Sequence, residues 1–155
     1  MLNLIETYEC KVDAKGRVAL PVGFRNQLSE VLEDGFVLKR GIFAKCLDLY
    51  PKKSWDIVMK EVGKLNRFNK KNDMFVRKLT AGLKKVDLDS STRFLIPKDL
   101  LLFSGISKNI VLIGQNDKIE VWDKDKYEAI INDDEGFGDL AEEVMGNLNF
   151  GEDVS

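Results

Sequence analysis

One residue pattern occurs twice in the chain and constrains its fold more than any other feature. Asp13 and Arg17 stand four positions apart, with a turn-like segment between them, an apolar run after them and a proline at the end of that run. The same pattern begins again at Asp89 and Arg93, each residue 76 positions after its counterpart. Because one short match arises by chance, a duplication requires that the similarity continue.

The similarity does continue through both copies. A strand-like run at 36–41 has its counterpart at 110–114, and the alternating run 46–50 has one at 118–122. The offset falls from 76 to 72 along the copies, as small loop deletions would cause. The chain is therefore an internal duplication, and each copy reads as strand, turn, strand, helix, strand, strand.

The turn of the first copy is predicted to be a tight hairpin. Asp13 is a natural turn opener because its carboxylate accepts backbone N–H bonds from the residues just ahead, and Gly16 supplies a position with positive φ. Such a hairpin projects Lys15 and Arg17. The second copy has Thr92 in place of the glycine, which leaves a different turn geometry open.

Two amphipathic helices are expected between the copies. The first should begin at Ser54 as N-cap, because apolar residues follow at i, i+3, i+4, i+7 and i+10. These residues are Trp55, Val58, Met59, Val62 and Leu65. The second helix is marked by Phe75, Leu79 and Leu83. This second segment has no counterpart within the second copy, so it is the connector, whereas the Trp55 helix matches a helix-like segment with Tyr127.

The chain divides accordingly into four predicted parts. They are a first repeat at 1–53, a basic helical connector at 54–84, a second repeat at 85–132 and an acidic C-terminal tail at 133–155. In the tail, Leu140, Val144 and Leu148 recur every four residues. This spacing indicates a short acidic amphipathic helix, with a partly disordered tail as the alternative.

Charge is strongly polarised along the chain, although the net charge is only −2. Residues 52–85 hold eleven basic and three acidic side chains, whereas residues 86–155 hold six basic and sixteen acidic ones. A basic segment of this kind is usually a solvated helical face. It also leaves room for contact with nucleic acid, which the overall charge conceals.

Composition excludes several classes of chemistry. The chain has no histidine, which rules out serine–histidine and cysteine–histidine catalysis and histidine-ligated zinc. Cys10 and Cys46 show no metal-binding spacing and read as small buried hydrophobes. We therefore expect no enzyme, no metal and no cofactor, and no small-molecule substrate.

The sequence also bears on the compartment. No run approaches the roughly 18 apolar residues that cross a bilayer, and residues 1–10 lack the pattern of a signal peptide. We therefore expect no membrane partner and a cytoplasmic location.

The duplicated hairpins, the proline-led helix after each and the strand ends Leu-Asp-Leu-Tyr-Pro and Glu-Val-Trp-Asp together resemble the MraZ family. Its members are bacterial transcriptional regulators of the division and cell-wall gene cluster. The resemblance runs from about Tyr8 to Ile131. It implies an α+β fold of two AbrB-like swapped-hairpin repeats, interlocked as a pseudo-dimeric small β-barrel with flanking helices. It also implies a closed ring of many subunits, associated with the nucleoid.

The resemblance further implies sequence-specific binding to short direct repeats in double-stranded promoter DNA. Carried over by position, the binding motif falls on Asp13, which would brace the turn, and on Lys15 and Arg17, which would reach the DNA. Arg25 matches a further basic position on the following helix. The second motif keeps Asp89 and Arg93 but offers one cation instead of two, which argues for a smaller contribution.

Two alternatives stay open from the residues alone. Each Asp–Arg pair is equally typical of a turn salt bridge, which contributes little energy. The whole chain is also compatible with a ring-forming interaction module that assembles with protein and has no specific DNA readout. Three readings of the basic connector also stay open: a solvated face, a ring interface that meets acidic partners, or a wall that attracts DNA. In the second reading, the acidic tail of one subunit would pair with the connector of another.

Overall fold

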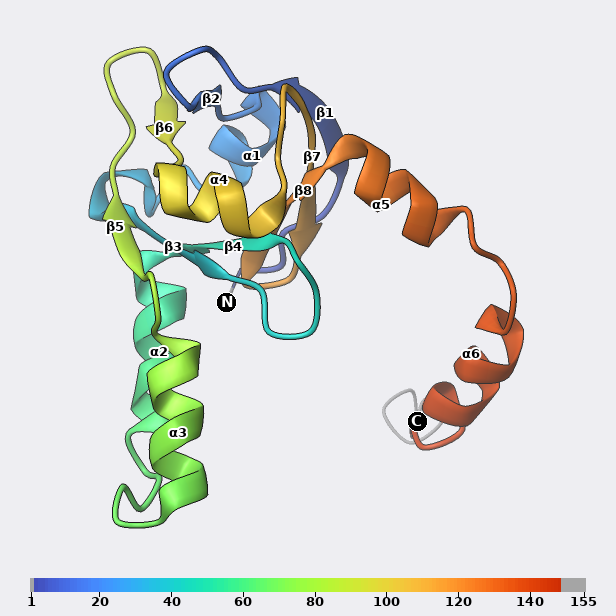
Figure 1. The fold of residues 1–155 in the computed structure, drawn as a ribbon. Helices are drawn as coiled ribbons and strands as arrows, with labels where there is room; N and C mark the ends of the chain where they lie inside the picture. Colours follow the sequence, from blue (N-terminus) through green and yellow to red (C-terminus); the bar gives the residue numbers. More distant parts are fainter. Residues whose placement is uncertain (1, 149–155) are drawn as a thin grey trace, which may run out of the picture. The chain divides into compact units, whose positions relative to one another are not determined.

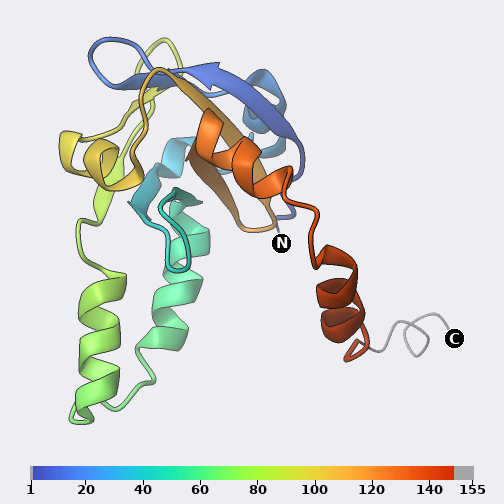
Figure 2. The ribbon, with the colours of Figure 1, turned by 45° about the vertical axis from the view of Figure 1, so that its right-hand side comes forward.

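The computed structural model describes residues 2–148. The chain forms an α+β structure that divides into two compact units between Lys124 and Asp125, and each unit is described by itself. Figures 1 and 2 show the elements in two views. Over the described residues, no helix combines the length and the apolar character needed to cross a membrane.

The larger unit is built on a six-stranded antiparallel sheet. In order across the sheet, its strands are β1 (Thr7–Lys11), β7 (Asn109–Gln115), β8 (Lys118–Asp123), β4 (Leu47–Pro51), β3 (Phe36–Arg40) and β5 (Lys84–Val86). Two further strands, β2 (Arg17–Ala19) and β6 (Arg93–Leu95), pair with each other as a separate ribbon.

Seven helical segments accompany the strands over residues 2–148. The larger unit has α1 (Val22–Gln27), the 3₁₀ turn η1 (Leu32–Asp34), α2 (Lys52–Val62), α3 (Lys70–Leu79) and α4 (Lys98–Ser104). Then come α5 (Lys124–Ile131), which begins at the last residue of the larger unit, and α6 (Phe137–Met145). The amphipathic helix predicted in the acidic tail is thus present as α6.

The two copies exchange strands reciprocally. The first strand of the first copy, β1, pairs with β7 of the second copy, with Thr7 opposite Ile113. The first strand of the second copy, β5, pairs with β3 of the first, with Phe36 opposite Val86. The central strands β4 and β8 join the copies. The sheet order is therefore the same from either edge, as a duplication with approximate twofold symmetry requires.

The expected small β-barrel is not closed by strand pairing over the described residues. The sheet ends at β1 and at β5, and β2 and β6 pair only with each other. The α+β class predicted from the sequence is confirmed. The reason for the open ladder is local: each hairpin turns its second strand out of the main sheet and into the shared ribbon.

Prolines set the starts of three helices. Pro21, Pro51 and Pro97 occupy the N-cap positions of α1, α2 and α4. The predicted N-cap at Ser54 was wrong, because α2 begins three residues earlier and buries Ser54 in its first turn. Proline has a fixed φ and cannot extend a strand's hydrogen bonds, so the chain turns into the helix directly after β4.

The main core is shared by both copies. Its fully buried side chains include Val18, Phe24 and Leu28 from the first copy and Phe94, Ile96 and Leu100 from the second. A second cluster of Val37, Tyr50, Trp55 and Leu79 packs α2 and α3 against the other face of β3 and β4. Those two strands are thus covered on both faces, which explains their nearly continuous burial. Figures 1 and 2 show α2 and α3 projecting from the end of this unit that lies away from β2 and β6.

Candidate nucleic-acid interface

The first hairpin turn is held together by the Asp13 side chain. Its Oδ1 accepts the backbone N–H of Lys15 at 2.9 Å and of Arg17 at 2.8 Å, and its Oδ2 accepts Nε of Arg17 at 2.8 Å. Gly16 takes a φ of 86° and donates its N–H to the Asp13 carbonyl. The predicted role of Asp13 as the brace of the turn is confirmed.

The second turn repeats this geometry without the glycine. Asp89 Oδ1 accepts the N–H of Ser91 at 2.9 Å and of Arg93 at 3.0 Å, and its Oδ2 accepts Arg93 Nε at 3.0 Å. Thr92 replaces the glycine with a φ of 57°. The different turn geometry left open by the sequence is therefore not found, and the aspartate bonds hold a threonine in the left-handed region.

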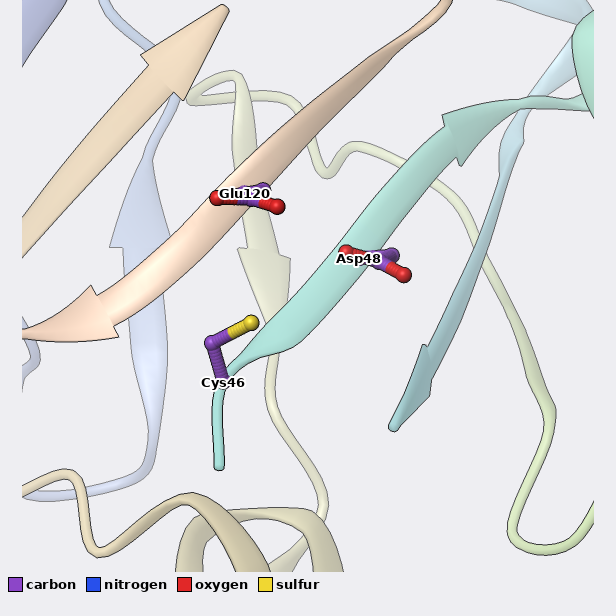
Figure 3. A group of neighbouring side chains, drawn as sticks. All are labelled: Cys46, Asp48 and Glu120. Carbon is purple, nitrogen blue, oxygen red and sulfur yellow. The ribbon is translucent and has the colours of Figure 1, made fainter. Parts of the chain in front are cut away.

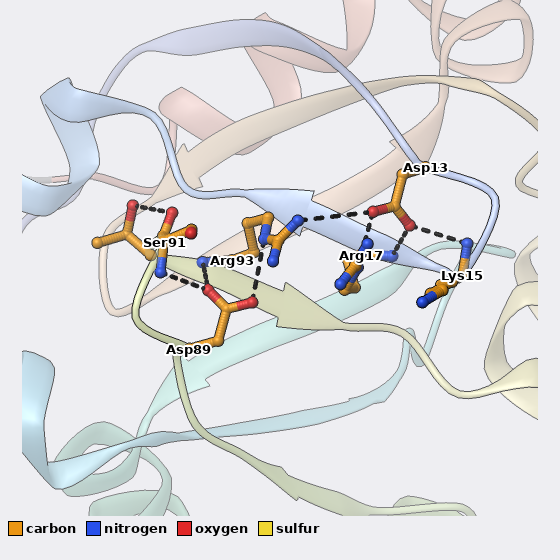
Figure 4. Close-up of polar contacts among 7 residues, drawn as sticks. Asp13, Lys15, Arg17, Asp89, Ser91 and Arg93 are labelled. Atoms are coloured by element: carbon orange, nitrogen blue, oxygen red, sulfur yellow. Dashed lines mark hydrogen bonds and ion pairs between the residues drawn. The ribbon is translucent and has the colours of Figure 1, made fainter.

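The strand ribbon brings the two turns into one site, as Figure 4 shows. In β2 and β6, Val18 lies opposite Phe94, and both side chains are buried. Arg93 Nη1 lies 4.0 Å from Asp13 Oδ2, so the guanidinium of one repeat reaches the carboxylate of the other. Motifs 76 positions apart in sequence thus form a single surface.

Alternation along the ribbon turns both arginines outward. Arg17 and Arg93 are each 32% exposed at the side chain, whereas the intervening Val18 and Phe94 point into the core. Ala19 and Leu95 are exposed on the outer face beside them. Sequence reasoning missed these two residues as part of the surface. Their i+2 spacing from the arginines was the available signal.

Lys15 and Arg25, the other basic residues predicted to bind DNA, both belong to the first repeat. Lys15 is exposed at the tip of the first turn. Arg25 lies on α1, half-buried, where its Nε donates to the carbonyl of Leu20 at 3.2 Å. This bond fixes the base of the guanidinium beside the end of β2. Equivalent positions in the second repeat hold Ser91 and Leu101, so the surface is more basic on the first side.

Electrostatics keeps both turn aspartates ionised. The backbone N–H of Arg17 donates to Asp13 and, with the other bonds of the turn, holds the pKa of that carboxyl below its ordinary value. The backbone N–H of Arg93 lowers the pKa of Asp89 in the same way. Each arginine therefore has a charged partner on the surface. A guanidinium has five N–H donors, so an arginine bonded through Nε has further donors that can contact a ligand.

A second cluster of ionisable groups lies at the centre of the sheet. Cys46, Asp48 and Glu120 offer ligand atoms within 4.8 Å of one another. Figure 3 shows these three side chains. Two ammonium groups lie at the same place, Lys39 Nζ at 3.8 Å from Asp48 Oδ2 and Lys118 Nζ at 3.2 Å from Oδ1.

The two lysine ammonium groups decide whether the central cluster could bind a metal ion. Burial raises the pKa of Cys46 to about 12, so the thiol is protonated, and the two ammonium groups already balance the carboxylates. A divalent cation would have to displace or repel both lysines. The arrangement is that of a buried ion-pair cluster and a poor metal site.

A family model described as "MraZ protein, putative antitoxin-like" matches the chain twice, over residues 4–78 and 79–147. Together the two matches span nearly all of the chain and separate the two repeats. The chain belongs to the MraZ family.

Relatives carrying the MraZ name align over nearly their whole length. The chain is 54% identical to "Transcriptional regulator MraZ" of Christiangramia forsetii and 53% identical to that of Flavobacterium psychrophilum. The alignments cover 97% and 96% of both chains, respectively. A more distant MraZ relative, from Pediococcus pentosaceus, is 35% identical and covers 89% of this chain and 94% of its own. The resemblance drawn from the duplicated hairpins is confirmed.

Proposed function

We propose that this chain is a transcriptional regulator that binds double-stranded DNA sequence-specifically through the ribbon of β2 and β6. Its sites would be short direct repeats in the promoter of the division and cell-wall gene cluster, and its working form a ring of identical subunits at the nucleoid. The names of the relatives, "Transcriptional regulator MraZ", support a regulator. The observation that carries the proposal is the joining of two aspartate-braced arginine turns in one exposed ribbon.

The chemistry of the ribbon suits base readout. Each arginine is held through Nε by the aspartate of its own turn, and Arg93 Nη1 also lies 4.0 Å from Asp13 Oδ2. The terminal nitrogens of a guanidinium form a fork of N–H donors that a base can accept. Such a fork matches guanine O6 and N7 in the major groove, where a two-stranded ribbon can enter. Preorganisation also means that less side-chain freedom is lost on binding.

The two turns would contribute unequally. The first offers Lys15, Arg17 and nearby Arg25, whereas the second offers Arg93 beside the exposed Leu95. Lys15 and Arg25 supply charge for phosphates, and Leu95 suits an apolar contact such as a thymine methyl group. One subunit would thus read an asymmetric sequence, as a direct repeat requires.

One ribbon makes few contacts, so the ring would supply the affinity. When several subunits each contact one repeat, the later contacts are effectively intramolecular. Head-to-tail assembly of identical subunits, each displaying the same ribbon, would match repeats of a single orientation. The AbrB-like swapped-hairpin description of the fold agrees with the reciprocal exchange of β1 and β5.

The test is binding to a fluorescent duplex of the protein's own upstream region, compared with a scrambled duplex, over a salt series. We expect Arg17→Ala to abolish the preference for the native duplex, so that the ratio of the two affinities falls by about 10-fold or more. The mass of the assembly should stay unchanged. Arg17→Lys keeps the charge but not the fork, so it should retain affinity for both duplexes and lose the preference.

Arg67→Ala is the matched control. Arg67 is an exposed arginine of the connector, held by Asp73 in a comparable side-chain pair. It should lower affinity for both duplexes equally, or not at all, and leave the preference intact. If the wild-type protein binds native and scrambled duplexes equally at every salt concentration, the DNA-reading proposal is wrong. The ring-forming interaction module is then favoured.

A further inference from the structure

One hollow in the larger unit has a lining that includes no residue of the ribbon of β2 and β6. It has a volume of about 960 Å³ and is formed by the β3–β4 loop (residues 41–46), α3 and Phe103 of α4. We call it the connector groove. Its floor and walls are apolar side chains that water reaches: Phe43 is 99% exposed, Met74 47% and Phe75 44%. Exposed apolar residues clustered in a hollow mark a binding surface.

The lining of the connector groove is basic. It includes Arg40, Lys45, Lys70, Lys71 and Lys78, and no acidic side chain is part of it in the described chain. Arg40 Cζ lies 4.9 Å and Lys45 Nζ 4.4 Å from the centre of the Phe103 ring, so two cations contact the same aromatic ring. Neither contact neutralises a charge. The groove therefore fits a partner that is both apolar and acidic.

The smaller unit carries a helix with the complementary character. Along α6 and the turn after it, one stripe of large apolar side chains is at least half exposed: Phe137, Leu140, Val144, Met145 and Leu148. Residues 133–148 contain six acidic side chains and no basic one. At about 1.5 Å per residue, the nine-residue α6 is roughly as long as the ten-residue α3.

We propose that α6 of one subunit docks in the connector groove of the next subunit and that this contact holds the ring together. The inference rests on the ring form proposed above and names its interface. The groove and α6 are different surfaces, so their contact is head-to-tail and generates a closed ring when the rotation per subunit allows it. The apolar stripe of α6 would cover the phenyl groups, and its carboxylates would meet the basic rim.

Nucleic acid is a weaker match for the connector groove. Phosphates would satisfy the lysines, but they would leave the exposed Phe43, Met74 and Phe75 uncovered. Figures 1 and 2 also place α3 at the opposite end of the larger unit from the ribbon. Docking of α6 would thus leave the ribbon of β2 and β6 free for DNA.

A matched pair of phenylalanines tests the interface in the full-length chain. Phe43 lies in the groove and Phe68 in the α2–α3 loop outside it, and each is 99% exposed, so neither substitution disturbs the core. We expect Phe43→Asp to shift the mass of the assembly, measured by native mass spectrometry or light scattering, from ring to single subunit. Phe68→Asp should keep the wild-type mass.

Charge reversal identifies the partner of the groove. Lys70→Glu with Lys71→Glu should weaken assembly at least 10-fold in subunit concentration, and so should Glu142→Lys with Glu143→Lys. The variant that combines all four substitutions should recover the mass of the wild-type assembly, because it restores opposite charges across the same contact. Lys60→Glu on α2, outside the groove lining, is the control and should leave the mass unchanged. Salt should weaken the wild-type assembly because the pairs lie at an exposed rim.

A photo-crosslinker in place of Phe43 gives the decisive result. We expect crosslinks to residues 137–148 of a second chain, seen as a dimer band and located by peptide mapping. Crosslinks to another segment, or only within one chain, overturn the proposal. So does a Phe43→Asp protein that keeps the ring mass. If Phe43→Asp keeps the ring mass, the protein still forms a ring and only the proposed interface is wrong. If the wild-type protein is monomeric, the ring part of the proposed function is wrong too.

Discussion

At the scale of single residues, the two turns show how one backbone shape is reached by two different amino acids. Gly16 adopts φ 86° at no steric cost, whereas Thr92 adopts φ 57°, which is costly for a β-branched residue. Both sit between the same aspartate bonds. The positions differ in their surroundings, because a Cβ on Gly16 would lie only 2.9 Å from the carbonyl oxygen of Ile96.

Exchanging the two residues should therefore have unequal effects. We expect Gly16→Thr to lower the free energy of unfolding by at least about 2 kcal/mol, from backbone strain and the contact with Ile96. Thr92→Gly should change it by less than about 1 kcal/mol, because relief of strain offsets the greater freedom of glycine in the unfolded chain. Urea unfolding at a fixed protein concentration measures both. Equal losses would contradict this reading of the turns.

At the scale of elements, β3, β4 and β8 carry a charged pair through the centre of the sheet. Lys39 and Asp48 are each 1% exposed, and Lys118 is the second cation beside the carboxylate. Burial raises the pKa of Asp48 and lowers the pKa of Lys39, each shift favouring the neutral form. The pair persists because each charge has a partner of opposite sign.

Removing one member of this pair should cost more than removing both. We expect Lys39→Met to lower the free energy of unfolding by about 3 kcal/mol, because Asp48 loses one of its two cations while it stays buried. Adding Asp48→Leu should recover most of the loss, since Lys118 is 24% exposed at the side chain and can turn to water. Denaturant unfolding of the single and double variants measures the difference. A double variant as unstable as Lys39→Met would contradict the explanation.

The sequence predicted the turns and α2 correctly because their formation depends on residues that are close in the chain. Asp13 and Asp89 each indicate a turn, and the apolar period around Trp55 indicates α2. The prediction of an N-cap at Ser54 was wrong because both Ser54 and Pro51 favour a helix start, and α2 begins after Pro51. Burial of Lys39 in β3 was not foreseeable from the strand itself, since its partner Asp48 lies on β4.

At the scale of the whole molecule, the exchange of strands ties the stability of one repeat to the other. Neither repeat can form its part of the sheet alone, because β1 needs β7 and β5 needs β3. The duplication was visible in the residues themselves, whereas an interlocking of the two repeats was implied only by the resemblance to the MraZ family. An offset of 76 positions says that two segments are alike and leaves open which of them pair.

The larger unit should consequently unfold in one step. The chain has two tryptophans, Trp55 in the connector next to the first repeat and Trp122 in the second repeat. Trp122→Phe keeps only Trp55, and Trp55→Phe keeps only Trp122. In each variant, we expect the fluorescence of the remaining tryptophan and the circular dichroism signal to have the same urea midpoint. Protein concentration must be held fixed, because assembly shifts apparent stability. Separate midpoints within one variant would show that the repeats unfold independently.

The pairing of β1 with β7 also sets the order in which the molecule can be completed in the cell. Thr7 is opposite Ile113, so β1 leaves the ribosome before its partner β7 and waits for roughly 100 further residues, some 5–20 seconds at ordinary rates of synthesis. Throughout that interval its backbone hydrogen-bonding groups have no native partner. Until β7 is made, β1 is open to mispairing, and the second repeat completes the sheet of the first.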